Sequence, residues 1–531
     1  MDEYLMFGNK VKMKKSRLAL IIVGITALFA FMLILYATGM GMTLKSDSVR
    51  YLMGAENLNA GNGYIRFAGD GSTRPISVFP PGYSLLLSAL MFTGMKALTA
   101  ARVLGVFFYT ANVFITGWFA YRITEKPLLA GLASLMVTGY VESLRYHTIA
   151  MSESPYIFFT LFSSFLLIEY LQKKRTWLLV VAAAMFGFVP VIRYLGAALL
   201  PAAALSILLF LDRDRRKRIQ AAVVFSILAV LPSAAWFFRN ARLTGSAANR
   251  AFEYHAVPLD KVAGYVDEAL SWFIPAVFQS EWRPRLSHLA VIVFLAAAVF
   301  VYFQWKRIRY TSESGLSDWK YQILPLYALS YLFLYMAIIF FSSAFLDASL
   351  GGFQRYLVPT LFFFVLILVD CINALTNLPG RWRLVGISAA GLWAVIIGLH
   401  FLETRQQLWD IRNNRNLGSL VEMMEDAAEF IENTDAPVMI TNDIDIAYLL
   451  TGRYAFMIPI RINDYTKELT DDYSQQMQAY FEKMDKGAVL VLFGKLDVQE
   501  NYATYEELTE GMEAVHSSFN VEIFKDPDFV P

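Results

Sequence analysis

Long runs of apolar residues alternate with short polar segments along most of the chain. Each run is roughly 20 residues long, which is the length an α-helix needs to cross a bilayer core of about 30 Å. The pattern predicts about eleven membrane-spanning helices. We expect them at about 18–40, 98–121, 127–142, 154–171, 176–190, 195–211, 219–238, 286–304, 322–345, 356–376 and 384–402.

The composition agrees with a membrane protein. Of the 531 residues, 56% are hydrophobic and only 17% are charged, whereas a soluble domain carries about 25% charged residues. The basic segment from Lys10 to Arg17 precedes the first apolar run, and that run is longer than the roughly 7–15 residues of a signal-peptide core. We therefore expect the first run to be retained as a helix.

Charge divides the chain into two regions. Residues 403–531 contain 10 Lys and Arg against 25 Asp and Glu, which leaves 36 and 20 of the chain's 46 and 45 for residues 1–402. The net charge of the whole chain is only +1, and a nucleic-acid partner is not expected. The single cysteine, Cys371, lies in an apolar run. It excludes a disulfide within the chain and a cysteine-rich metal site.

Basic residues recur in every second predicted loop. This alternation fits the positive-inside rule if the N-terminus is cytoplasmic. An odd number of spans then places the tail outside the cytoplasm, in a multi-pass protein of the plasma or inner membrane. The basic loops contain Arg122 and Lys126, Lys173 to Arg175, Arg213 to Arg218, Lys306 to Arg309, and Arg381 and Arg383.

The tail has the pattern of an α/β domain. Apolar strand candidates at 437–442, 488–493 and 521–524 alternate with helix-like segments at about 417–432, 445–450, 470–485 and 504–514. Such alternation favours a small layered domain that folds by itself from about residue 415. The predicted fold is a mainly α-helical polytopic membrane domain, 1–402, followed by an extracytoplasmic α/β domain, 403–531.

The first predicted outer loop, 41–97, has candidate chemistry. Apolar residues at helical spacing in 47–60 predict an amphipathic helix at the membrane surface, and Asp47 lies at its start. A Pro-Pro pair, Pro80 and Pro81, then opens a second apolar helix at about 79–95. Because loops carry chemistry more often than spans do, we expect the functional site here.

A series of residues, from Asp47 in the first predicted outer loop to 440–459 in the tail, resembles the GT-C superfamily of polyprenyl-phosphate-dependent glycosyltransferases in both type and order along the chain. The resemblance is to the branch with protein O-mannosyltransferases and the lipid A aminoarabinose transferase. It departs from the former at Asp47-Ser48, where they have an Asp-Glu pair, and from the latter at Pro80-Pro81-Gly82, where they have Lys-Pro-Pro. The matching positions are Asp47, Tyr51, Ala55 and Gly61, then Pro80 to Leu90 with Tyr83, Ser152-Glu153, Arg193 to Gly196, Trp236 to Asn240, Gln354 to Pro359, and 440–459 in the tail.

The resemblance implies an inverting glycosyltransferase with a GT-C-like fold. Asp47 and Glu153 are the implied catalytic acids, since an acid at the bilayer surface can take the acceptor's proton. Arginine suits a lipid-phosphate leaving group because its planar fork donates two parallel hydrogen bonds. The implied substrate-binding residues are Tyr51, Tyr83, Arg193, Arg239 and Arg355.

Each of these residues also has a structural interpretation. Asp47 with Ser46 is a good N-terminal cap for the interfacial helix, and Glu153 suits the first turn of a span. Arg239 is also explained as an interfacial anchor, and His147 as a loop residue rather than a metal ligand. The acids Asp47, Asp70 and Glu153 are candidates for a divalent cation, but their spacing does not show one, and no cofactor or metal site is assigned.

Three functions compete. The favoured one moves a sugar from a polyprenyl-phosphate donor in the membrane to an extracytoplasmic glycan, lipid or protein. A ligase or polymerase acting on lipid-pyrophosphate-linked glycans is the alternative enzyme. A transporter or flippase of lipid-linked sugars would be expected to show paired broken helices in two repeated halves, and we find no such repeat in the sequence.

Overall fold

The computed structural model divides the chain into two compact units. The first contains residues 1–40 and 77–412, and the second contains residues 41–76 and 413–531. The structure describes residues 2–67, 69–70, 72–211, 214–247, 252–275, 323–346, 353–413, 424–434, 436, 438–462, 470, 472–494, 501–518 and 520–529.

The first unit is a bundle of long apolar helices. Within the described ranges, seven helices are long and apolar enough to cross a membrane, or eight if one bent pair counts as a single span. Every predicted span has a corresponding helix except 286–304, which lies outside the described residues. The helices are α1 (Asp2–Ala37), α3 (Gly82–Met91), α4 (Ala97–Thr124), α5 (Pro127–Gly139), α6 (Val141–Thr148), α7 (Glu153–Lys173), α8 (Thr176–Ile192), the 3₁₀ helix η1 (Tyr194–Ala198), α9 (Leu199–Phe210), α10 (Arg215–Thr244), α11 (Leu259–Ser271), α13 (Ile323–Phe345), α14 (Phe353–Asn377) and α15 (Arg381–Asn413).

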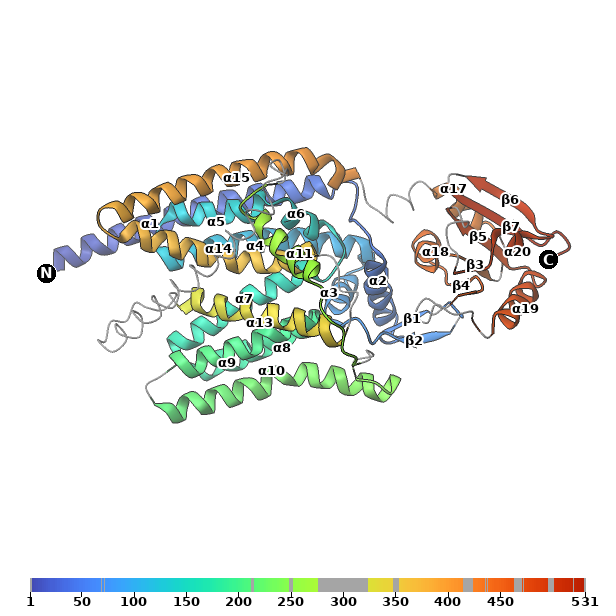
Figure 1. The fold of residues 1–531 in the computed structure, drawn as a ribbon, viewed down its shortest axis with the longest axis horizontal. Coiled ribbons are helices and arrows are strands. Elements are labelled where there is room, and N and C mark those ends of the chain that lie inside the picture. Colours follow the sequence, from blue (N-terminus) through green and yellow to red (C-terminus); the bar gives the residue numbers. More distant parts are fainter. Residues whose placement is uncertain are drawn as a thin grey trace. The chain divides into compact units, whose positions relative to one another are not determined.

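The burial of these helices fits a protein surrounded by lipid. In the most apolar part of α14, 78% of the residues are buried, against 28% in α10 and 22% in α15. Figure 1 shows α10 and α15 on opposite sides of the bundle. Large apolar side chains such as Leu231 and Leu384 are exposed there, which in water would be an unusually large apolar patch. The chain is an integral, multi-pass membrane protein, as the sequence predicted.

Two breaks in the helices position polar side chains inside the bundle. Helices α5 and α6 bend by 59° at their junction, Tyr140. Helix α8 ends at Ile192, and Arg193 has extended backbone angles before η1 begins. A Cβ atom on Gly196 would lie 2.7 Å from Cγ1 of Val189, so η1 packs back onto α8 only because residue 196 is glycine.

The second unit contains a five-stranded mixed sheet with the order β4-β3-β5-β7-β6. Strand β3 pairs in parallel with β4 and β5, whereas β7 pairs antiparallel with β5 and β6. Its strands are β3 (Met439–Thr441), β4 (Ala455–Met457), β5 (Val489–Phe493), β6 (Glu513–Ser518) and β7 (Val521–Lys525). Its helices are α17 (Glu425–Glu432), α18 (Ile444–Thr451), α19 (Tyr473–Met484) and α20 (Tyr505–Thr509).

Both faces of this sheet are covered. Val489 and Val491 of β5 belong to one core cluster, and Leu490 and Leu492 belong to another. A strand buried on both faces reads as a continuous apolar run, which is why β3, β5 and β7 were predicted. Together with the helical bundle, the sheet confirms the predicted fold class.

Two strands of the tail were missed. The helix predicted at 504–514 ends at Thr509, and after a turn at Gly511, with φ of +76°, the chain enters β6. Strand β6 is an edge strand with a largely polar sequence, and β4 has only three residues. Neither length nor alternation therefore marked them as strands.

The loop that was predicted as the first outer loop is divided between the two units. Helix α2 (Ser46–Asn59) and the hairpin of β1 (Ile65–Phe67) and β2 (Thr73–Pro75) belong to the second unit, and α3 belongs to the first. The predicted amphipathic helix at 47–60 matches α2 closely. Contacts therefore divide the chain within the loop, at residue 76, whereas the predicted domains were 1–402 and 403–531.

Candidate functional site

Glu153 is the first residue of α7, and its side chain is completely buried, with a relative exposure of 0%. A buried carboxylate is stable only when it is paired and hydrogen-bonded. Two guanidinium groups do this, because Nη1 of Arg193 and Nε of Arg355 both donate to Oε1 of Glu153. The sequence interpretation listed all three residues, but it did not predict that they would meet.

Three structural elements bring this triad together. Arg193 occupies the break between α8 and η1, and Arg355 lies in the first turn of α14. The guanidinium of Arg193 also lies over the ring of Tyr356, 5.3 Å from its centroid. One carboxylate and two guanidiniums give the triad a charge of +1, and Oε2 of Glu153 accepts no hydrogen bond from the described residues. A small buried site with excess positive charge suits an anion.

Arg239 does not bind Glu153, but contacts through Trp236 connect it to Tyr194, the residue after Arg193. Its Nη1 donates to Oδ1 of Asn240 at 3.0 Å, and its guanidinium lies 4.9 Å from the ring of Trp236. Nε1 of Trp236 donates to the hydroxyl of Tyr194, the neighbour of Arg193, at 2.9 Å. The structure therefore joins two of the three predicted arginines on one carboxylate and links the third to them indirectly.

Tyr83 lies in the first turn of α3, where its side chain is buried. A Cβ atom on the preceding Gly82 would lie 2.8 Å from the carbonyl oxygen of Val191. The Pro-Pro-Gly segment therefore has a structural reason: Pro81 precedes the helix and Gly82 lets its first turn touch the end of α8. That end leads directly into Arg193.

Asp47 and Tyr51 belong to the second unit, on α2. The N-terminal cap of α2 is Lys45, and its backbone N–H donates to the hydroxyl of Ser48 at 3.0 Å. Asp47 lies in the first turn and is half-buried, so the capping interpretation of Asp47 is wrong. Tyr51 points to the buried side of α2.

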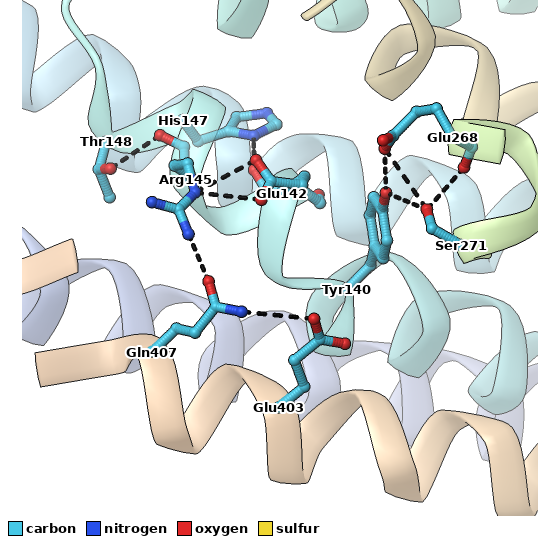
Figure 2. Close-up of polar contacts among 10 residues, drawn as sticks. Tyr140, Glu142, Arg145, His147, Thr148, Glu268, Ser271, Glu403 and Gln407 are labelled. Carbon is cyan, nitrogen blue, oxygen red and sulfur yellow. Dashed lines mark hydrogen bonds and ion pairs between the residues drawn. The ribbon is translucent and has the colours of Figure 1, made fainter. Parts of the chain in front are cut away.

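A second cluster of polar side chains surrounds the bend between α5 and α6 (Figure 2). The hydroxyl of Tyr140 donates to Oε1 of Glu268 at 2.6 Å and lies 2.8 Å from the hydroxyl of Ser271, both on α11. Arg145 of α6 donates to Oε1 of Glu142 at 3.2 Å and also to Oε1 of Gln407. These contacts tie the bend to α11 and α15.

Helix α15 contributes three polar residues to this cluster. Nε2 of Gln407 donates to Oε1 of Glu403 at 3.3 Å, and Nδ1 of His400 lies 3.6 Å from Oε2 of Glu403. Sequence reasoning ended the last span at residue 402, before Glu403 and Gln407, and did not single out His400 within that span. Their spacing at positions 400, 403 and 407 places all three on one face of a helix, and that is the signal that would have found them.

His147 was expected in a loop, and this was wrong because it lies on α6 in the core. Its Nδ1 donates to the carbonyl oxygen of Ser143 at 2.6 Å, and its Nε2 accepts from Nδ2 of Asn112 at 3.0 Å.

Three acids, Asp47, Asp70 and Glu153, were considered as ligands of a divalent cation. The carboxylate of Asp70 accepts hydrogen bonds from Ser72 and Arg74. Across the described residues, no three His, Cys, Asp or Glu side chains are grouped to hold a metal ion.

An apolar cavity of about 790 Å³ lies between α1 and α4. Its lining includes Phe31, Leu35 and Phe107, and among the described residues that line it Arg102 is the one with a charged side chain. Nε of Arg102 donates to the hydroxyl of Thr38 at 3.2 Å, just beyond the end of α1. On α7, the ring of Phe158 lies 5.6 Å from that of Phe107, so one lining residue of the cavity packs against the helix that begins at Glu153.

The helical bundle that holds the buried arginine–carboxylate site has the same fold as membrane glycosyltransferases of known structure. Among solved structures, it is similar to ArnT from Cupriavidus metallidurans bound to undecaprenyl phosphate, with a TM-score of 0.57 and 11% identity over 95% of this chain and 98% of that one. The apo state of the same protein gives a TM-score of 0.58.

A second similar structure is the arabinofuranosyltransferase AftD from Mycobacteria. Its TM-score is 0.54 at 13% identity, and the match covers 95% of this chain but 40% of that one. No family model matches the sequence, and no curated protein matches it. At these identities the similarity is one of fold.

Proposed function

We propose that this protein transfers a sugar from a polyprenyl-phosphate donor to an acceptor outside the cytoplasm, with inversion at the anomeric carbon. The observation that carries the proposal is the buried carboxylate of Glu153 with Arg193 and Arg355 on one oxygen. The shared fold with ArnT, solved with undecaprenyl phosphate, and with AftD supports the same class of reaction.

The reaction needs a base and a stabilised leaving group. In the proposed step, an acceptor hydroxyl oxygen forms a bond to the anomeric carbon while the bond from that carbon to the phosphate oxygen breaks. Asp47 takes the hydroxyl proton, and the polyprenyl phosphate leaves as an anion. Arg193 and Arg355 stabilise that anion, because guanidinium groups held before the reaction stabilise charge as it develops.

The contacts of Glu153 favour a positioning role over the catalytic role that the sequence suggested. A carboxylate that already accepts from two guanidiniums is a weak base. It fixes Arg193 and Arg355 in one orientation, and that lowers the cost of ordering them when a phosphate binds. We therefore assign the base to Asp47 and the phosphate contacts to the two arginines.

The cavity between α1 and α4 suits the isoprenoid chain of the donor. It is apolar except near Arg102, and its residue Phe107 touches α7 through Phe158. Helix α7 begins at Glu153, so a lining residue of this cavity packs against the helix that carries the proposed phosphate site.

The proposed orientation has a cytoplasmic N-terminus. Nζ of Lys126 donates to Asn377 at 3.0 Å, and Lys126 is electrostatically coupled to Lys15 and Arg383. Basic residues from three predicted cytoplasmic segments therefore gather at one end of the bundle, the end where the N-terminus and the turn between α14 and α15 lie in Figure 1. Since α7 ends at Lys173 on the basic side, Glu153 lies at the opposite, outer end.

One assay separates this proposal from the ligase and flippase alternatives. The purified protein is reconstituted in liposomes with fluorescent polyprenyl-phosphate pentoses and hexoses, and the release of free polyprenyl phosphate is followed with a panel of acceptors. A ligase would require a pyrophosphate-linked donor, and a flippase would move the donor across the bilayer without releasing phosphate. Failure to release polyprenyl phosphate from any of these donors would contradict the proposal.

A further inference from the structure

Helix α2 of the first outer loop and helix α18 of the tail share a core. Val49 and Met53 on α2 are buried with Tyr448 on α18, and Leu449 and Phe67 pack against them. On α2 the two residues are four apart, so they form one stripe along the helix. The helix that carries Asp47 thus buries this stripe against the tail domain.

A hydrogen bond reinforces this apolar contact. The hydroxyl of Tyr448 donates to the carboxylate of Glu56, which lies one turn beyond Met53 on α2. Burial raises the pKa of Glu56. The ring of Tyr448 also stacks on Tyr454, with centroids 5.5 Å apart, and Tyr454 stacks on Phe67 of β1. One tyrosine therefore contacts the loop helix directly and its hairpin through a neighbour.

The hairpin β1–β2 is held at the edge of the tail sheet. Strand β4 is an edge strand, and the backbone N–H of Met457 donates to the carbonyl oxygen of Gly69 at 2.7 Å. A Cβ atom on Gly69 would lie 2.6 Å from Cβ of Met457, so only glycine allows this approach. The loop therefore covers an edge that would otherwise expose unpaired backbone groups.

Charged residues extend the contact toward Asp47. Asp445, in the first turn of α18, interacts electrostatically with Arg50 and Asp47 on α2 and with Arg66 on β1. Arg50 and Asp47 are three residues apart and therefore neighbours on the helix surface. The tail thus reaches both ends of α2, with Asp445 near its start and Tyr448 near its end.

We propose that the tail domain positions the loop helix that carries Asp47, and that Tyr448 is the positioning residue. This inference rests on the proposed function, in which Asp47 is the base. The chain enters this unit after residue 40, leaves it after residue 76 and returns after residue 412. Helix α2 is therefore connected to the helical bundle at both ends of the segment 41–76. A change in how the tail packs on α2 would disturb the loop between α1 and α3.

The test uses full-length protein in liposomes and the variant Tyr448→Phe. Removing a hydrogen bond to a charged group should increase amide hydrogen exchange in 46–59 by about 10–100-fold. Turnover should fall by about 10-fold, with the KM for the donor unchanged within about 2-fold, because the proposed phosphate contacts are elsewhere. The matched control is Tyr473→Phe, which removes a tyrosine–glutamate bond of 2.9 Å to Glu507 within the tail itself. It should change neither quantity.

Two further variants guard against a local artefact of Tyr448→Phe. Glu56→Leu removes the acceptor of the same bond, and Gly69→Ala pushes the hairpin off β4; both should reproduce the exchange and turnover changes. The proposal is overturned if exchange in 46–59 stays at the wild-type level in all three variants. It is also overturned if exchange rises while turnover does not change. A wild-type protein without transferase activity would refute the proposed function, whereas the exchange data would still decide whether loop and tail are joined.

Discussion

Arg193 and Arg355 donate to the same carboxylate oxygen, Oε1 of Glu153, although one follows α8 and the other opens α14. Because the carboxylate is fully buried, its charge is stabilised by the two guanidinium groups, and it in turn holds both of them in place. A pair of guanidiniums fixed in this way has its donors oriented before any ligand arrives. That arrangement is what stabilisation of a phosphate leaving group requires.

Replacing Glu153 by Gln should destabilise the fold by about 3–5 kcal/mol, because it leaves two guanidiniums without their buried counter-charge. Thermal unfolding of the purified protein in detergent would measure the loss. Removing one arginine as well, in Glu153→Gln/Arg355→Met, should restore part of it. Glu142→Gln is the control, since the Arg145–Glu142 pair is partly exposed and should be worth less than about 1 kcal/mol. Equal stability of Glu153→Gln and wild type would refute the buried triad.

Replacing Arg355 by Ala should weaken the binding of undecaprenyl phosphate by about 10–100-fold, since a hydrogen bond to a charged group is lost. Arg355→Lys should restore only part of the affinity, because an ammonium cannot make the bidentate contact. Quenching of a fluorescent polyprenyl phosphate would give the affinities, with the uncharged polyprenol as control ligand. If the variants bound the phosphate as tightly as wild type, Arg355 would not contact it.

Replacing Asp47 by Asn should lower turnover by roughly 10²–10⁴-fold if Asp47 is the base. Because the cap of α2 is Lys45, the loss cannot be explained by loss of a helix cap. Donor binding should persist, since the proposed phosphate contacts are elsewhere. Asp70→Asn is the control: Ser72 and Arg74 lower the pKa of Asp70 to about 2 in an exposed turn, and its turnover should stay near normal. Near-normal turnover of Asp47→Asn would remove the assignment.

The contact between α2 and α18 should be stronger in weak acid than at neutral pH. Burial raises the pKa of Asp445 to about 6, with Arg50 and Arg66 lowering it and Asp443 and Asp47 raising it. A carboxyl group whose pKa is raised by folding contributes stability below its unfolded pKa of about 4, and that contribution is lost as the pH rises to about 6. Amide protection in 46–59, corrected for the intrinsic exchange rate, should therefore fall over this range.

Asp445→Asn should reduce this pH dependence and leave the part that comes from Glu56, whose pKa is also raised by burial; it should increase protection at pH 7.5 by about 1–3 kcal/mol. Amide protection in 46–59 of the variant Asp443→Asn serves as the control. Asp443 caps α18 by accepting from the backbone of Asp445 and Ile446 at 3.0 and 2.9 Å, and Asn caps about as well. The cap should survive, and most of the pH dependence with it. A pH response unchanged in Asp445→Asn would show that another group titrates.

The orientation in the membrane can be tested by labelling with an impermeant maleimide. In a Cys371→Ser background, a cysteine at the exposed position Glu125 should be protected in intact cells, and one at the exposed position Asp528 should react. Lysis should make both react. Labelling of both positions in intact cells would contradict the proposed map.

The local pattern of the sequence determined the elements of this protein. Apolar runs of membrane-spanning length predicted the helices of the bundle, because in lipid a span must satisfy its own backbone hydrogen bonds. The amphipathic helix at 47–60 was found as α2, since its apolar stripe repeats with helical spacing. The buried strands β3, β5 and β7 were found because they read as short, mainly apolar runs. Each of these signals depends only on which residues lie next to each other in the chain.

The tertiary structure alone decided which side chains meet. Glu153, Arg193 and Arg355 were named separately, but no spacing rule places their side chains together, because Glu153 opens α7, Arg193 follows α8 and Arg355 lies in α14. The bonds of Tyr140 to Glu268, and of Arg145 to Gln407, join segments that no local period connects. The contact of α2 with α18 likewise joins the first loop to the tail. The sequence pattern predicts that one face of a helix or strand is buried. Which other segment covers that face depends on how the whole chain packs.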